Sequence, residues 1–399
     1  MFTRKSYLEL WRGERYISRH VTTVDAADSA QADAMEHGGG VYQLKVGDAL
    51  YYEVDMSFML GSGGDIEEVA PPVLVGRKFN PGPYIKSRGG HTNTDQDAYH
   101  ADMLNQVTNN INNIPEYQGA LVAFACGYIN PAPGVYEFTA VDNMLNFLKS
   151  QGKRLMFEMP WKSFNNASIE WIAPADLLPD QALQTNSPGW IWMVWRQANM
   201  DRLIEIWAAI ADRYDSDPNF ELVTGAESGP SLGGVPQADF THNSLRDQLI
   251  RLDEANAVAF QNTTWCPYIN SLAGRQDALL ESAYQNRIGF GEPDYSRSAA
   301  SSLWRGDTVS SEVDREFRGT IVHHAIYSGS QAAIQAPEDS LIFNETGGID
   351  GGGQQATHIS FVIGLNPPGD LANVEAAIQA NPDAFATACP SRFSSCVTG

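Results

Sequence analysis

The sequence lacks any hydrophobic run that could cross a membrane, because no segment approaches the ~20 consecutive apolar residues that a spanning helix needs. The first residues, MFTRKSYLELWRGERY, also lack the apolar core of a signal peptide. We therefore expect neither membrane insertion nor secretion by a signal peptide. An extracellular or virion-associated location would need another export route.

Cysteine is scarce, with 4 residues in 399, and none of them forms a Cys-x-x-Cys pair. Such pairs supply the ligands of structural zinc sites, so we expect no metal centre. The adjacent His323 and His324 do not change this, because neighbours on a strand point to opposite faces. Cys389 and Cys396 are spaced for a short disulfide, whereas the other two cysteines stand in apolar contexts typical of buried thiols.

Basic residues are few: 26 Lys and Arg stand against 48 Asp and Glu, which gives a net charge of −22. Proteins hold nucleic acids and anionic membranes largely through Lys and Arg, so we expect neither as a partner. The glycine-rich segment GGIDGGGQQ lacks the Lys-Ser/Thr and the strand-to-helix context of a phosphate loop. We therefore expect no nucleotide and no other cofactor.

The first 78 residues show the alternation of apolar and polar residues that is typical of β-strands. SYLELWRGERYISRHV and VYQLKVGDALYYEVDMSF each predict strands, and DAADSAQADAMEHGGG between them predicts a short helix. The unit resembles the small immunoglobulin-like or fibronectin-like modules appended to bacterial and phage surface proteins. A β-rich, sandwich-like domain is therefore predicted over residues 1–78, with a Gly- and Pro-rich linker at its end.

Residues 79–399 alternate between apolar strands and amphipathic helices, which predicts βα units and a parallel sheet. The helix TAVDNMLNFLKS, for example, places Val141, Leu145 and Leu148 on one face. GALVAFACGYI, RLMFEMPW, FELVTGAESG, NAVAFQNTTW and NRIGFGEPDY predict strands. The last region offers IVHHAIYSG, QAAIQAPE, LIFNETGG and ISFVIGLNPP, and a choice among them gives eight units. The predicted fold class is α/β, a (β/α)8 TIM barrel over residues 79–399.

Carboxylates are expected at the mouth of this barrel, because the carboxyl ends of the strands form the active-site face. Glu227 follows the fourth strand and precedes Ser-Gly-Pro, so it is the first catalytic candidate. The second candidate is Glu345 or Glu338, because either SLIFNETGG or QAAIQAPED could be the seventh strand. Glu345 is favoured since it follows the more apolar segment. The alternatives are a hairpin that removes both from the site, and a Glu227 held by an arginine at the rim.

Aromatic and polar residues also follow the predicted strands, as expected for a site that stacks on sugar rings and bonds their hydroxyls. The expected substrate-binding residues are Tyr128, Trp161, Lys162, Trp265, Glu292, Asp294 and Arg88. Trp190, Trp192 and Trp195 form a second aromatic group, for which stacking on a glycan and packing onto the barrel are equally favoured.

The segment GALVAFACGYINPAPGVYEFTAVDNMLNFLKSQGKRLMFEM resembles the second strand, loop, helix and third strand of (β/α)8 glycosidases of the cellulase and β-galactosidase clan. The resemblance continues to about residue 229, and it implies a glycoside hydrolase with Glu227 as general acid/base. The sequence departs from the clan at two places. The usual Asn-Glu pair is Ala226-Glu227, and the loop after the second strand reads INPAPG without its glutamate.

Two functions are consistent with these patterns. The first is a glycosidase that cleaves a polysaccharide or oligosaccharide with two carboxylates, by retention in the simplest case. The second is a non-catalytic structural or carbohydrate-binding component of a phage tail or cell-surface assembly, which would act within a larger complex. The fold does not distinguish them.

Overall fold

The computed structural model describes residues 7–12, 15–21, 41–46, 49–55, 76–87, 96–163, 172–174, 176, 182–184, 189–230, 232, 238–269, 272, 274–292, 323–327, 356–363, 370–385, 387–390, 393 and 395–398. The chain divides into two compact units, Met1–Pro71 and Pro72–Gly399. Arg77–Lys78 forms a strand within the second unit, and the domain boundary after residue 78 stays a prediction.

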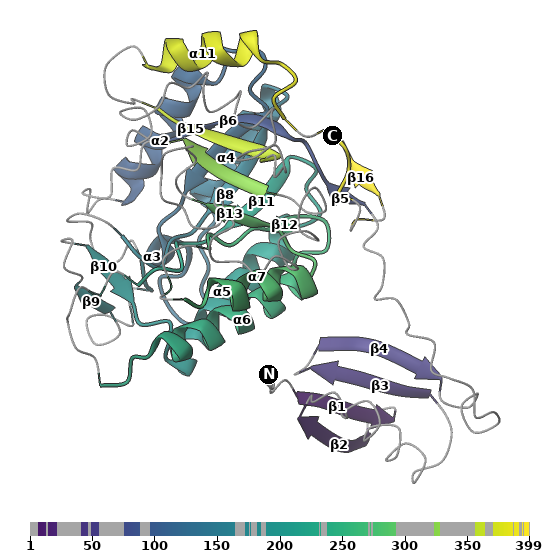
Figure 1. Ribbon diagram of the computed structural model, residues 1–399. Coiled ribbons are helices and arrows are strands. Elements are labelled where there is room, and N and C mark those ends of the chain that lie inside the picture. Colours follow the sequence, from purple (N-terminus) through teal and green to yellow (C-terminus); the bar gives the residue numbers. More distant parts are fainter. Residues whose placement is uncertain are drawn as a thin grey trace. The chain divides into compact units, whose positions relative to one another are not determined.

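The first unit contains one antiparallel sheet (Figure 1). Its strands are β1 (Tyr7–Arg12), β2 (Arg15–Val21), β3 (Val41–Val46) and β4 (Ala49–Asp55), in the order β2-β1-β3-β4. These strands lie within the two segments whose alternation predicted them. The helix predicted between them lies outside the described residues, and the resemblance to an immunoglobulin-like module stays a prediction.

The second unit is built around an eight-stranded parallel sheet with the order β12-β11-β8-β7-β6-β15-β14-β13. Its strands are β6 (Gly82–Lys86), β7 (Gly119–Ala123), β8 (Arg154–Glu158), β11 (Phe220–Thr224), β12 (Thr264–Trp265), β13 (Phe290–Glu292), β14 (His323–Tyr327) and β15 (His358–Val362). The two end strands meet, because Gly291 N donates to Pro267 O at 2.8 Å and Tyr268 pairs with Gly291. The sheet therefore closes on itself in chain order, which is the predicted (β/α)8 barrel.

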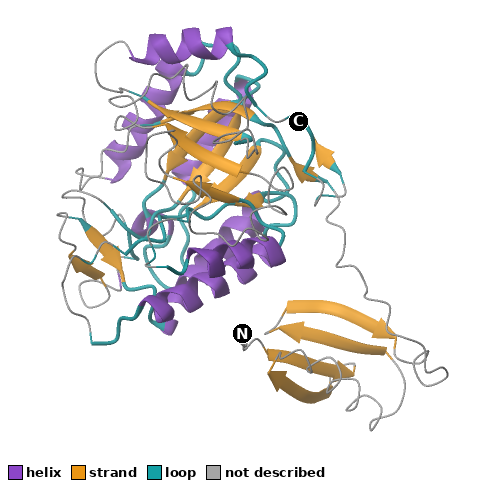
Figure 2. Cartoon of the chain, viewed as in Figure 1, coloured by secondary structure: helices purple, strands orange, loops and turns teal. Residues whose placement is uncertain are grey.

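Helices cover the outside of this barrel (Figure 2). They are α2 (Gln96–Asn110), α4 (Thr139–Ser150), α5 (Gln197–Tyr214), α6 (His242–Ala259), α7 (Gln276–Gln285) and α11 (Asp370–Ala380), with a single turn, α3 (Cys126–Ile129), after β7. Val141, Leu145 and Leu148 are all buried, as the periodicity of α4 predicted. The amphipathic helices thus supply one wall of the hydrophobic core.

Side chains alternate along each barrel strand between this outer core and the barrel interior. Leu155 and Phe157 of β8 pack with the helices, whereas Met156 between them belongs to a separate inner cluster. The inner cluster comprises Phe79, Tyr84, Leu121, Met156, Leu222, Cys266, Tyr268, Ile326 and Phe393. On β6 and β8, the residue two positions after Tyr84 or Met156 therefore also faces the interior, and this locates two polar groups at the mouth.

Two predicted strands are wrong. In NAVAFQNTTW, residues 256–259 are the last turn of α6, and the strand is only Thr264–Trp265. The buried residues Leu249, Leu252 and Asn256 follow helical spacing into this segment, so its first residues were wrongly assigned to a strand. The seventh strand is β14, from IVHHAIYSG. QAAIQAPED and SLIFNETGG therefore do not fill that position, and they lie outside the described residues.

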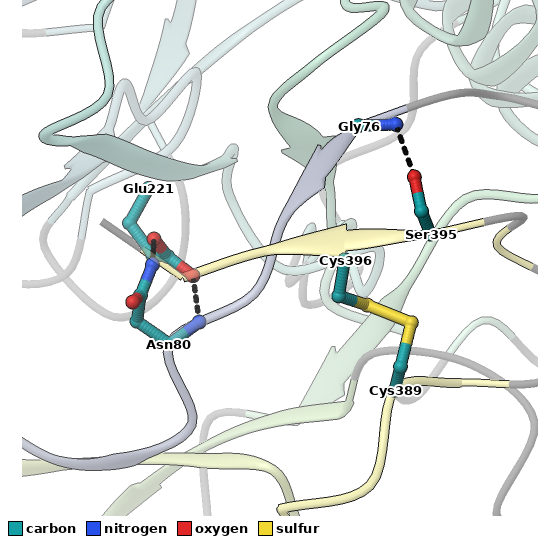
Figure 3. The surroundings of a disulfide bond; sticks show 6 residues. All are labelled: Gly76, Asn80, Glu221, Cys389, Ser395 and Cys396. Atoms are coloured by element: carbon teal, nitrogen blue, oxygen red, sulfur yellow. Dashed lines mark hydrogen bonds between the residues drawn. A yellow bond between two sulfur atoms is a disulfide. The ribbon is translucent and has the colours of Figure 1, made fainter.

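The amino-terminal end of the barrel is closed by the carboxyl-terminal segment. β5 (Arg77–Lys78) pairs in parallel with β16 (Cys396–Val397), and the Cys389–Cys396 disulfide stands beside this pair, as Figure 3 shows. Gly76 N also donates to Ser395 Oγ at 3.0 Å. The disulfide that the spacing allowed is present, and the other two cysteines are free and buried, as predicted.

A buried polar group lies above this closure, inside the barrel. Glu221 accepts hydrogen bonds from the backbone and side-chain nitrogens of Asn80, both at 2.7 Å (Figure 3). It also lies 3.3 Å from His358 Nε2. Burial raises the pKa of Glu221, but the bonds from His358 and Asn80 outweigh it and hold the pKa below its ordinary value. These contacts satisfy the group fully at the end of the barrel away from the mouth, so we assign it to the scaffold.

Candidate active site

Glu227 stands at the mouth of the barrel, just beyond the end of β11. Its backbone pairs with Tyr268, and Ser228 N donates to Tyr268 O at 3.0 Å, so the strand direction continues past the regular sheet. The side chain keeps 23% of its surface exposed. The structure thus places the first catalytic candidate where the sequence predicted it, on the rim and open to solvent.

Lys162 lies beside Glu227 and is almost wholly buried. Its Nζ donates to Gly229 O at 2.5 Å and is 3.5 Å from Glu227 Oε2. Burial lowers the pKa of Lys162, and the Glu227 carboxylate partly offsets that effect. These contacts are to the protein itself, so the ammonium fixes the segment that carries Glu227. The predicted contact of Lys162 with a sugar stays a prediction.

A short antiparallel sheet holds the Lys162 segment in place. β9 (Ala182–Gln184) pairs with β10 (Trp190–Trp192), and Ile191 of β10 in turn bridges to Lys162. Trp192 N donates to Trp161 O at 2.9 Å. Of the second aromatic group, Trp192 and Trp195 are buried while Trp190 is half-buried. Packing thus explains two of the three rings, and Trp190 alone keeps a partly open face.

Trp265 is wrong as a substrate-binding residue, and Trp161 has no exposed ring face to offer. Trp265 is fully buried, because it alternates with the inward-facing Cys266 and so points outward, where its Nε1 donates to Asp253 Oδ1 at 2.8 Å. Trp161 is 3% exposed and packs over Gly225, at which an added Cβ would lie 2.0 Å from the ring. Both tryptophans support the walls behind Glu227.

The remaining predicted residues differ in how far the structure places them. Tyr128 is half-buried in α3, and its ring centroid lies 4.4 Å from that of His100. Partial burial raises the pKa of Tyr128, and the charge of Glu137 adds to the effect. The backbone of Glu292 ends β13, but its side chain is outside the described part. Also outside it are Arg88, Asp294, Glu338 and Glu345.

Two residues that the sequence analysis missed face the barrel interior at the mouth. Lys86 ends β6 and Glu158 ends β8, each two positions after an inner-cluster residue, Tyr84 and Met156. Their side chains form an ion pair between Lys86 Nζ and Glu158 Oε2, with 17% and 13% of their surfaces exposed. The alternation in RLMFE could have found Glu158, because its parity matches that of Met156.

Tyr268 connects this pair to Glu227. Its ring is buried in the inner cluster, and its backbone pairs with that of Glu227. Burial raises the pKa of Tyr268 far above its ordinary value, and the charges of Glu158 and Glu227 both raise it further. Both carboxylates therefore lie near one phenol at the mouth of the barrel.

Among the described residues, no group of three or more His, Cys, Asp or Glu is arranged to hold a metal ion. No helix in the described part of the chain is long and apolar enough to span a membrane.

Comparison with known proteins supports the fold. No protein-family model and no curated sequence matches the chain. Among solved structures, the catalytic domain of β-amylase from Paenibacillus polymyxa has a TM-score of 0.50 at 9% identity, over 77% of this chain and 99% of that one. Endo-glycoceramidase II from Rhodococcus sp. gives 0.48 at 15%, over 74% and 76%. A GH5_18 protein from Bifidobacterium longum subsp. infantis gives 0.48 at 10%, over 78% and 81%. At 9% identity, the likeness to the β-amylase domain shows the fold alone, a TIM barrel.

Proposed function

We propose that this chain is a glycoside hydrolase in which Glu227 donates a proton to the glycosidic oxygen. The observation that carries the proposal is the position of Glu227, partly exposed at the carboxyl end of the fourth barrel strand and supported by the buried Lys162. Catalytic groups of TIM barrels stand at this face. The β-amylase domain supports the barrel on which this assignment depends.

The reaction needs a second carboxylate. One acid protonates the leaving oxygen while the other attacks the sugar carbon or activates water, through an oxocarbenium-like transition state. We retain Glu345, with Glu338 as the alternative, for this role, since both follow β14 in the chain. We propose retention, for which the two carboxyl groups would be about 5 to 5.5 Å apart, against roughly 6.5 to 9.5 Å for inversion.

The Glu227→Gln variant tests the proposal on a panel of aryl glycosides. General acid catalysis contributes roughly 10²- to 10⁴-fold, so kcat/KM, which reports the glycosylation step, should fall by that factor on substrates with poor leaving groups. The loss should be much smaller with a 2,4-dinitrophenyl leaving group, which departs without protonation. Glu205→Gln, an exposed residue of α5, is the matched control and should keep full activity. Equal activity of Glu227→Gln and wild type on every hydrolysed substrate would refute the assignment.

A second candidate function is that of a non-catalytic carbohydrate-binding or structural component of a surface or phage-tail assembly. One observation favours it: Glu227 contacts the ammonium of Lys162, as a rim carboxylate with a structural role would. This function predicts glycan binding without turnover by the wild-type protein, measured by release of reducing ends over days.

A further inference from the structure

The ion pair of Lys86 and Glu158 lies inside the barrel, at its mouth. It crosses the barrel interior from the first strand to the third, and the last residue of β7 between them is the small Ala123. The side chains are level with the mouth, since each is the final residue of its strand. Both side chains keep part of their surface exposed, so solvent reaches the two charged heads.

The structure gives little reason to assign the pair a purely structural role. β6, β7 and β8 are already joined by continuous parallel hydrogen bonding, so no extra tie is required there. Withdrawing two charges from water costs free energy that their attraction often fails to recover. Both side chains also remain partly exposed, at 17% and 13% of their surfaces, whereas a buried structural ion pair needs no contact with solvent.

We propose that Lys86 and Glu158 form the floor of a sugar subsite and bind neighbouring hydroxyl groups of an uncharged sugar ring. The inference rests on the proposed function, because it takes the mouth to be a glycan site. A carboxylate accepts from two hydroxyls at once and an ammonium offers three donors, so together they match the mixed donor and acceptor character of a diol. Such charge-assisted bonds are stronger than neutral ones.

The restriction to uncharged rings follows from the charges around the mouth. The ammonium of Lys86 is neutralised by the Glu158 carboxylate, and that of Lys162 by the Glu227 carboxylate. The mouth therefore has no excess positive charge from these two lysines to attract an anionic sugar. A carboxylated ring would meet the charges of Glu158 and Glu227, both of which act at Tyr268. Like charges at short range disfavour binding.

The experiment measures binding of hydroxylated piperidine iminosugars of gluco, galacto, manno and xylo configuration to the full chain, by calorimetry. Their protonated nitrogen and ring hydroxyls probe the acidic and the hydroxyl-binding parts together. Glu158→Gln should weaken binding on the order of tenfold to a hundredfold, because a charge-assisted hydrogen bond is lost. Lys86→Met should weaken an uncharged methyl glycoside of the same configuration but not the cationic iminosugar, since it leaves Glu158 unneutralised.

Two further variants separate binding from folding. The swap Lys86→Glu with Glu158→Lys keeps an ion pair, so a structural pair predicts unchanged affinity, whereas a hydroxyl-binding floor predicts loss. Lys149→Met breaks a comparable pair with Asp217 at 2.7 Å outside the mouth and should leave affinity unchanged. Thermal unfolding of each variant shows that it is folded.

The results also separate this inference from the proposed function. Binding that depends on Glu158 in a protein that hydrolyses no glycoside would uphold the floor and refute the hydrolase. If the wild type hydrolyses a glycoside but Glu158→Gln binds the iminosugar as tightly as the wild type, the hydrolase proposal is upheld and the sugar-binding floor is refuted. Absence of binding by the wild type at millimolar iminosugar would overturn the inference outright.

Discussion

Asp253 is a buried acid that the proposed reaction does not use. It lies on α6, is 2% exposed, and accepts a hydrogen bond from Trp265 Nε1 at 2.8 Å. Burial raises its pKa to about 7, although bonds from Trp265 and Ser282 lower it somewhat. It also lines a small, mostly apolar cavity together with Ala226 and Ser228, the neighbours of Glu227. It therefore lies in the packed wall behind the catalytic candidate.

Stability should depend on pH through this residue. The folded pKa of about 7 exceeds the ordinary 3.8, so between these values the folded chain binds the extra proton and stability falls as pH rises. Since about three pKa units separate the two states, the loss amounts to about 4 kcal/mol at most. Asp253→Asn keeps an acceptor for Trp265 and should lose this dependence, as urea unfolding at pH 4.5 and pH 8 would show.

Asp247→Asn is the control, because Asp247 is exposed on the same helix. It should retain the wild-type difference between the two pH values. A wild-type protein that is equally stable at both, or an Asp253→Asn variant with the same slope as wild type, would contradict the role assigned to the buried acid.

Individual site residues could be predicted from the sequence only where the pattern of apolar residues showed clearly where a strand ends. Glu227 follows the wholly buried β11, so its place at the rim could be inferred. Trp265 was assigned to the wrong face because β12 has 2 residues, too few to show alternation. Glu158 was missed because the predicted strand RLMFEMPW was taken to end at Trp161, whereas β8 ends at Glu158. The pairing of Glu158 with Lys86 depends on β6, β7 and β8 being neighbours in the sheet, which no local pattern contains.

The carboxyl-terminal segment is the element on which closure of the amino-terminal end depends. Phe393 belongs to the inner cluster, and the guanidinium of Arg77 lies 5.7 Å from its ring centroid. The Cys389–Cys396 disulfide encloses this phenylalanine in a short loop. The bond therefore restricts the unfolded freedom of the residues that fill the bottom of the barrel.

Replacing both cysteines of this disulfide by serine should lower the free energy of unfolding by about 2 kcal/mol, the scale expected for so short a loop. Reduction of the wild-type protein should have the same effect. Reductant should not affect the double variant further, because Cys126 and Cys266 are free and buried. Thermal unfolding with and without dithiothreitol measures the effect of reduction. An unfolding midpoint of the wild type that is the same in both conditions would refute the stabilising role of the disulfide.

Helices were predicted better than strands. α4 and α5 bury long faces at helical spacing, so their apolar residues alone identify them. The seventh strand could not be chosen among four apolar segments of similar length, because period-two alternation does not record which strands become neighbours. That choice was settled by the pairing of β14 with β13 and β15.

At the scale of the whole molecule, the chain consists of two units that each form their own sheet. The first ends at Pro71, and the strands of the barrel unit pair only with one another among the described residues. We therefore predict that deletion of residues 1–71 leaves the thermal midpoint of the barrel and any glycosidase activity unchanged. Insoluble expression, or loss of activity in a folded fragment, would show that the first unit is required.

The parallel pairing of β5 with β16 brings the two ends of the barrel unit side by side, at the face opposite the mouth. A short linker could therefore join them and new ends be opened elsewhere, so the unit is suited to circular permutation. The same geometry means that a tether attached beside β5 or β16 would hold the barrel with its opening turned toward the surrounding medium.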